Sequence, residues 1–72
     1  MTSCKLAQLV IEENRPFDYG WLRYNYKKGG YKAILDIAKS TTEGFTDSTM
    51  SKQLIGRAAK IVADEIMSEL RY

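Results

Sequence analysis

The sequence predicts a small all-α domain, and three observations support that fold class. Apolar residues recur at spacings of three and four along the last third of the chain, a pattern typical of a long amphipathic helix. The same spacing marks shorter segments nearer the N-terminus. The 72 residues are too few for more than one domain, so we expect residues 1–72 to form one unit of three or four helices.

The first predicted helix covers residues 3–13. Ser3 can cap its N-terminus, because a serine hydroxyl accepts a hydrogen bond from one of the first free backbone N–H groups. Pro16 ends it, because the residue before a proline is pushed out of the helical conformation. Its predicted buried side consists of Leu6, Ala7, Leu9 and Val10.

Residues 17–28 fit two structures. As a helix, the segment can be capped by Asp18 and closed by Gly29 in the left-handed conformation. As a strand, its aromatic residues would alternate, and Gly29-Gly30 would turn a hairpin over residues 21–35. We prefer the helix because the segment that follows also has helical spacing. An α+β fold with a hairpin at residues 21–35 is the alternative.

A short helix is predicted next, from Tyr31 to about Ser40. Tyr31, Ile34 and Ala38 stand on one side of it. Residues 40–46 are predicted to form a polar loop, in which Gly44 makes a turn and Phe45 anchors the loop in the core.

The long C-terminal helix is predicted over residues 47–70, capped by Thr46, Asp47 or Ser48. Its apolar side consists of Met50, Leu54, Ala58, Ile61, Val62, Ile66 and Leu70. Gly56 interrupts it at a cost of about 1 kcal/mol relative to alanine, which indicates a bend or a close approach by another helix. We expect this helix to pack across the others.

Composition excludes several kinds of site. There is no histidine, and Cys4 is the single cysteine, so neither an intramolecular disulfide nor a zinc site of the usual ligands can form. No nucleophile stands with a base, and we expect no catalytic residues, no metal, no cofactor and no enzymatic activity. The N-terminal residues lack an apolar run that could target or span a membrane, so we expect a cytoplasmic protein.

The net charge of +2 is unevenly distributed. Residues 14–35 carry five basic residues against one acid, whereas residues 61–72 carry three acids against one base. Such a distribution indicates either an anionic partner at the basic end or contact between copies of the chain.

Two segments in the second half of the chain resemble the helix-turn-helix of lac-repressor-type regulators. Asp36-Ile37-Ala38, a turn, and then Ser48-Thr49-Met50-Ser51-Lys52-Gln53-Leu54 resemble its Asp-hydrophobic-Ala and Thr-hydrophobic-Ser-basic-x-Leu pattern. The resemblance covers residues 35–56, and the connection is longer than the tight turn of that family. It implies a DNA-binding regulator whose second helix enters the major groove. The base-contacting residues that it implies are Ser48, Thr49, Lys52, Gln53 and Arg57.

Basic and aromatic residues also alternate around Gly29-Gly30. Lysine and arginine bind phosphates, aromatic rings stack on bases, and glycines before a helix expose N–H groups to an anion. The predicted phosphate-binding or anion-binding residues are Arg23, Lys27, Lys28, Gly29, Gly30 and Lys32.

We therefore expect a small nucleic-acid-binding protein, a helix-turn-helix-like regulator with DNA as its partner and a homodimer formed through the C-terminal helix. This requires Thr49, Lys52 and Gln53 to be exposed beside the basic segment. A second hypothesis is a helical protein-interaction module or inhibitor with Trp21, Tyr24 and Tyr26 in one exposed patch. A third is an oligomeric binder of a phosphorylated ligand at residues 28–32.

Overall fold

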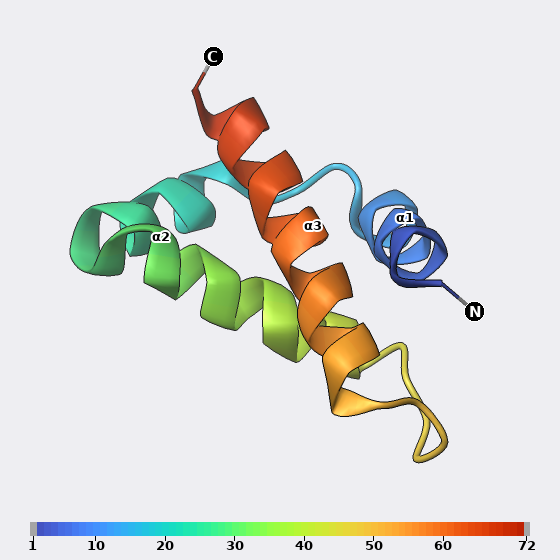
Figure 1. Cartoon of the computed structure of the whole chain (residues 1–72). Helices are drawn as coiled ribbons and strands as arrows, with labels where there is room; N and C mark the ends of the chain where they lie inside the picture. Colours follow the sequence, from blue (N-terminus) through green and yellow to red (C-terminus); the bar gives the residue numbers. More distant parts are fainter. Residues whose placement is uncertain (1, 72) are drawn as a thin grey trace.

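The structure, a computed structural model, describes residues 2–71, which form three helices and no strand (Figure 1). The helices are α1 (Ser3–Asn14), α2 (Tyr19–Glu43) and α3 (Lys52–Leu70). The all-α fold class is therefore confirmed. The alternative hairpin is excluded, because all of residues 21–35 lie within α2.

α3 is the helix on which the other two pack; in Figure 1 it passes in front of α2, and α1 lies on its right. Both α1 and α2 contact α3 extensively, whereas α1 and α2 touch each other little. The buried residues of α3 are Ala58, Ala59, Val62, Ala63 and Ile66. Because three of these are alanines, the neighbouring helices can come close to the α3 backbone.

Leu9 and Ile61 were wrongly predicted to be buried. They lie at the surface, with 37% and 36% of their area exposed. α3 is contacted by both α1 and α2, and the small side chains of Ala59 and Ala63 are buried while Ile61 is not. Helical spacing of large apolar residues does not reveal such a contact, because alanine carries little hydrophobic signal.

α3 begins at Lys52, five residues after the predicted start at Asp47. The Ser51 hydroxyl caps it by accepting from the Leu54 N–H at 3.1 Å. Asp47 instead holds a turn, in which its Oδ1 accepts from the Thr49 N–H at 2.9 Å and from the Thr49 hydroxyl. Local hydrogen bonds of this kind compete with helix formation, and so the earliest capping residues do not start the helix.

α2 consists of two helical halves joined at a kink. Gly30 has φ 68° and ψ −157°, a conformation that strains any residue with a Cβ. Gly29 is needed for a different reason, because a Cβ there would lie 2.8 Å from the Cβ of Ala33. The positive φ was predicted at Gly29 and lies one residue later. After the kink, residues 31–43 run back past α3 (Figure 1).

The second half of α2 continues to Glu43, three residues beyond its predicted end at Ser40. Thr41 and Thr42 donate their hydroxyls to the carbonyls four residues earlier, at 2.9 and 2.7 Å. These polar side chains are therefore satisfied inside the helix, and Thr42 is fully buried. Phe45 packs against the core, as predicted.

The ends of the first two helices follow the expected capping chemistry. Thr2, one residue before the predicted cap Ser3, accepts from the Lys5 N–H at 3.2 Å. Asp18 caps α2, as predicted, by accepting from the Trp21 N–H at 3.1 Å.

Within residues 2–71, no helix has both the length and the apolar character needed to cross a membrane.

Candidate functional site

Basic and aromatic residues of α2 and of the last turns of α3 gather around two neighbouring hollows. We name this region the kink surface. It consists of Arg23, Tyr26, Lys27, Lys28, Tyr31, Lys32 and Arg71. Arg71 was not predicted as a site residue. It reaches the basic segment only because α3 packs against α2, and no local sequence pattern carries that information.

Two neighbouring hollows lie in the kink surface, and Tyr26, Met67 and Arg71 border both. The first, of about 280 Å³, is also lined by Arg23, Lys27 and Leu70. The second, of about 400 Å³, is also lined by Tyr31, Asp64 and Ser68. The first hollow therefore offers cations above an apolar floor, and the second offers hydroxyls and one carboxylate.

Tyr31 and Asp64 form a hydrogen bond in the second hollow. The Tyr31 hydroxyl donates to Asp64 Oδ1 at 2.9 Å. Partial burial, followed by this hydrogen bond and the charge of Asp64, raises the pKa of Tyr31. The hydroxyl therefore stays protonated as a donor at neutral pH, while other lone pairs of the carboxylate can accept from a ligand.

The tyrosines of α2 present rings as well as hydroxyls. Tyr26 is 41% exposed and Tyr31 is 38% exposed, so part of each ring is open to a ligand. The ammonium group of Lys28 lies 5.0 Å from the ring centroid of Tyr24, a cation–π contact. Cations and aromatic faces thus alternate around the outer side of α2.

The acids near the C-terminus are largely engaged elsewhere. Arg15 Nη2 lies 2.8 Å from Glu65 and 3.4 Å from Glu69. The Tyr19 hydroxyl donates to Glu69 at 2.6 Å, and this hydrogen bond is the main reason that the pKa of Tyr19 is raised. Glu65 and Glu69 therefore face the α1–α2 connection, on a different side of α3 from Arg71 and the kink surface.

The predicted base-contacting residues do not lie on one helix. Ser48 and Thr49 belong to the connection between α2 and α3, whereas Lys52, Gln53 and Arg57 are exposed on the first turns of α3. The connection covers residues 44–51, which is longer than a helix-turn-helix turn.

These residues are also far from the basic segment. Lys52 borders a hollow with Lys39 and Glu43, at the end of α3 opposite Arg71. At 1.5 Å per residue, α3 is roughly 28 Å long. The DNA-binding hypothesis required Thr49, Lys52 and Gln53 to be exposed beside the basic segment. They are exposed, but they do not lie beside it.

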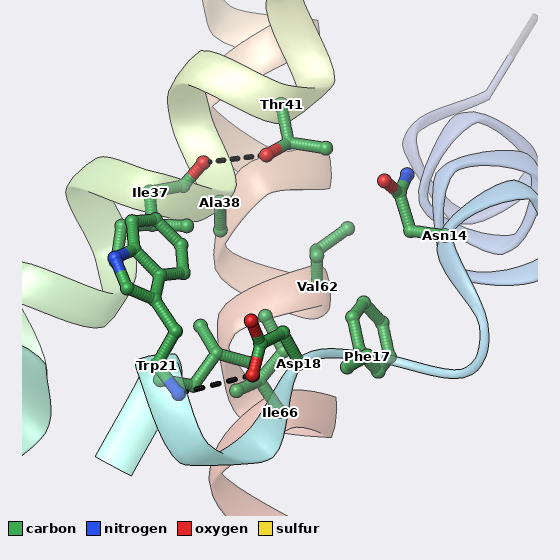
Figure 2. A pocket seen from close by; sticks show the side chains of 10 residues that line it. Asn14, Phe17, Asp18, Trp21, Ile37, Ala38, Thr41, Val62 and Ile66 are labelled. Carbon is green, nitrogen blue, oxygen red and sulfur yellow. Dashed lines mark hydrogen bonds between the residues drawn. The ribbon is translucent and has the colours of Figure 1, made fainter. Parts of the chain in front are cut away.

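A separate apolar pocket of about 190 Å³ opens between the two halves of α2 and the core (Figure 2). Its lining residues are Asn14, Phe17, Asp18, Trp21, Leu22, Ile37, Ala38, Thr41, Val62 and Ile66. Figure 2 shows Trp21 on the same side of the pocket as Ile37. Trp21 is 52% exposed, so much of its indole can contact another molecule.

The predicted aromatic patch is divided between two surfaces. Trp21 borders the apolar pocket, and Tyr24, which is 56% exposed, stands one helical turn further along the same helix. Tyr26 borders both hollows of the kink surface instead. The three residues are all exposed, but they do not form one continuous patch.

Comparison with protein-family models, with curated proteins and with solved structures finds no match to this chain. Within residues 2–71, no group of three or more Cys, Asp or Glu residues is arranged to hold a metal ion. The kink surface and the apolar pocket are therefore the features from which a function can be inferred.

Proposed function

We propose that this protein binds nucleic acid through the kink surface. The observation that carries the proposal is that Lys27 of α2 and Arg71 after α3 line one hollow. Lys28 and Lys32 extend this positive region along the kinked segment of α2. Clusters of lysine and arginine bind phosphate backbones and release their counterions, which supplies most sequence-independent affinity for nucleic acid.

The surroundings of this hollow favour the same partner. Glu65 and Glu69 are paired with Arg15, away from the kink surface, and so they weaken its positive potential little. Exposed tyrosine rings beside the cations can stack on bases while the cations bind phosphates. The proposal keeps the predicted partner and the predicted phosphate-binding segment of α2, and it does not use the predicted base contacts of residues 48–57.

Dimerisation through α3 stays a prediction. α1 and α2 occupy the apolar side of α3, so a second copy would have to pack on its exposed side. That side carries Gln53, Arg57, Lys60 and Ile61. A pair of these surfaces would bring the basic residues Arg57 and Lys60 of both copies together, and their repulsion disfavours a dimer through this side of α3.

Charge reversal at the two ends of α3 tests the proposal. In the first variant Lys27→Glu is combined with Arg71→Glu, and in the matched control Lys52→Glu is combined with Arg57→Glu. Both change the net charge equally. We expect the first variant to bind labelled DNA and RNA far more weakly in fluorescence anisotropy and the control to bind them as the unmodified protein does. In a salt series at low ionic strength, where the variant still binds, losing two phosphate contacts should make the slope of log K against log salt shallower by about 1.4 to 1.8.

The opposite result for the two variants would contradict nucleic acid binding at the kink surface. If the Lys52 and Arg57 variant lost binding while the Lys27 and Arg71 variant kept it, the first turns of α3 would be the contact, as the helix-turn-helix resemblance implies. If the unmodified protein bound no nucleic acid even at low salt, the function itself would be refuted.

The exposed Trp21 beside an apolar pocket favours a second candidate, a protein-interaction module. Tryptophan dominates the energetics of many protein interfaces, and an apolar pocket next to it can receive a side chain of the partner. Immobilised protein should then retain a partner that the Trp21→Ala variant does not retain. The Lys27 and Arg71 variant should retain it normally, which separates this function from the first.

A further inference from the structure

The two hollows of the kink surface differ in chemistry although they share three residues. Lys27 and Arg71 border the first, which suits an anion. Asp64 lies in the second, where its carboxylate repels anions and accepts hydrogen bonds. A ligand that fills both must therefore carry negative charge at one end and hydrogen-bond donors at the other, with a flat or apolar part near Tyr26 and Met67.

We infer that the kink surface binds an unpaired nucleotide of a single strand, with its phosphate at Lys27 and Arg71 and its base beside Tyr31 and Asp64. The inference rests on the proposed function and specifies its substrate. Arg71 borders both hollows, so it can contact the phosphate while the base lies in the neighbouring hollow. Tyr26 also borders both and offers a partly exposed ring on which the base can stack.

The base has to be unpaired for two reasons. Bases within a duplex are stacked on their neighbours, so the Tyr26 ring cannot reach a base face unless the base leaves the stack. The hydrogen-bonding edge that Asp64 would contact is also occupied by the complementary base in a duplex. A single strand satisfies both requirements without unstacking a helix.

Asp64 further selects among bases. Its Oδ1 accepts from the Tyr31 hydroxyl, and the carboxylate retains lone pairs for an amino group of a base. Cytosine, adenine and guanine each carry an exocyclic amino group, which is a donor. Thymine and uracil present an N–H group between two carbonyl oxygens, and the carboxylate repels those oxygens. The site should therefore prefer amino-bearing bases.

The test uses fluorescence anisotropy with labelled oligonucleotides of one length. They are single-stranded oligo(dC), oligo(dT), oligo(rC) and oligo(rU), together with a mixed-sequence duplex. We expect single strands to bind about tenfold more tightly than the duplex, and cytosine strands about fivefold more tightly than thymine or uracil strands. Agreement between the DNA and RNA pairs would assign the preference to the base and not to the sugar.

Two variants locate these effects. Tyr26→Ala should weaken single-strand binding about tenfold and leave duplex binding unchanged, whereas Trp21→Ala, which removes an exposed ring outside the kink surface, should change neither. Asp64→Asn should abolish the preference for cytosine without lowering the salt dependence. A role of Asp64 in folding alone would not alter base preference, so this readout isolates its contact with the base.

Failure of the inference differs from failure of the proposed function. If the duplex bound as tightly as the single strands, and Tyr26→Ala had no effect, the inference would be overturned. Sensitivity to the Lys27 and Arg71 reversal would then still support nucleic acid binding. If no oligonucleotide bound, both would be refuted.

Discussion

Two tyrosine hydroxyls of α2 donate to acids of α3. Tyr19 donates to Glu69 at 2.6 Å, and Tyr31 donates to Asp64 at 2.9 Å. The hydrogen bond to Glu69, followed by burial and the charge of Glu69, favours the protonated hydroxyl of Tyr19. For Tyr31 burial is the main cause, and the hydrogen bond to Asp64 and its charge add to it. Both pKa values are therefore raised above the ordinary value of 10.0.

The raised pKa values predict a loss of stability at alkaline pH. The folded state holds these two protons more tightly than the unfolded state. Their contribution is therefore complete below pH 10.0, the ordinary tyrosine pKa that applies in the unfolded chain, and is lost as pH rises through the folded pKa values. Urea unfolding at increasing pH should show this decline, and it should be shallower in the Tyr19→Phe and Tyr31→Phe variants.

Ultraviolet titration of the tyrosines gives an independent check. Part of the phenolate absorbance of the native protein should appear at higher pH than in the urea-unfolded chain, and each Phe variant should remove some of that late absorbance. Coincident native and unfolded titration curves would contradict the two hydrogen bonds.

Two aspartates, Asp18 and Asp47, were predicted to cap helices, and only the first of them does so. Asp18 was predicted to cap α2 and does so. Asp47 was predicted to help cap the last helix and instead closes a turn with Thr49. The two aspartates have similar local patterns, but α3 starts at the Ser51 cap, and Met50 and Leu54 on either side of that cap pack against the core. Sequence spacing alone does not specify which of several capping residues starts a helix.

At the level of elements, the kink in α2 creates the candidate site. It places Tyr31 beside Asp64 while Arg23 and Lys27 remain beside the end of α3. Helical spacing predicted a helix on both sides of the glycines. The direction of the second half depends on the backbone angles of Gly30, and spacing cannot supply these.

Alanine substitutions at Gly30 and Gly56 test the kink in α2 and the open surface of α3. Gly30→Ala should lower the free energy of unfolding by about 1–2 kcal/mol, because its positive φ strains a residue with a Cβ. Gly56 lies exposed within α3, and nothing lies within 4 Å of a Cβ added there. Gly56→Ala should therefore raise the free energy of unfolding by about 0.5–1 kcal/mol.

Urea denaturation of the two variants and the unmodified protein measures both effects. A neutral Gly30→Ala substitution would contradict the kink. A destabilising Gly56→Ala substitution would contradict an open surface at that position. Gly56 was predicted to mark a bend or a close approach, and the structure shows no close approach within residues 2–71.

At the scale of the whole molecule, the fold redistributes the charge seen along the sequence. The acidic C-terminal segment does not form a separate negative end, because Arg15 pairs with Glu65 and Glu69. Arg71 from the same segment joins the basic residues of α2. The pairing with Arg15 therefore reduces the negative charge available for contact between oppositely charged ends of two copies.

The principal dimensions of 34 × 21 × 16 Å separate the candidate surfaces widely for so small a protein. The kink surface and residues 48–57 lie at opposite ends of α3, and the Trp21 pocket lies between the halves of α2. A single partner of modest size can cover one of these surfaces without covering the others. Binding can therefore be assigned to one of them by experiment.

An NMR titration of ¹⁵N-labelled protein with a short cytosine-rich single strand tests nucleic acid binding at the kink surface most directly. We predict that the largest shift changes fall on residues 23–32 and on Asp64, Met67 and Arg71. Little change is expected at residues 48–57 or around Trp21 and Ile37. Changes concentrated on residues 48–57 would contradict the kink surface and favour the helix-turn-helix hypothesis, and an unchanged spectrum would contradict nucleic acid binding itself.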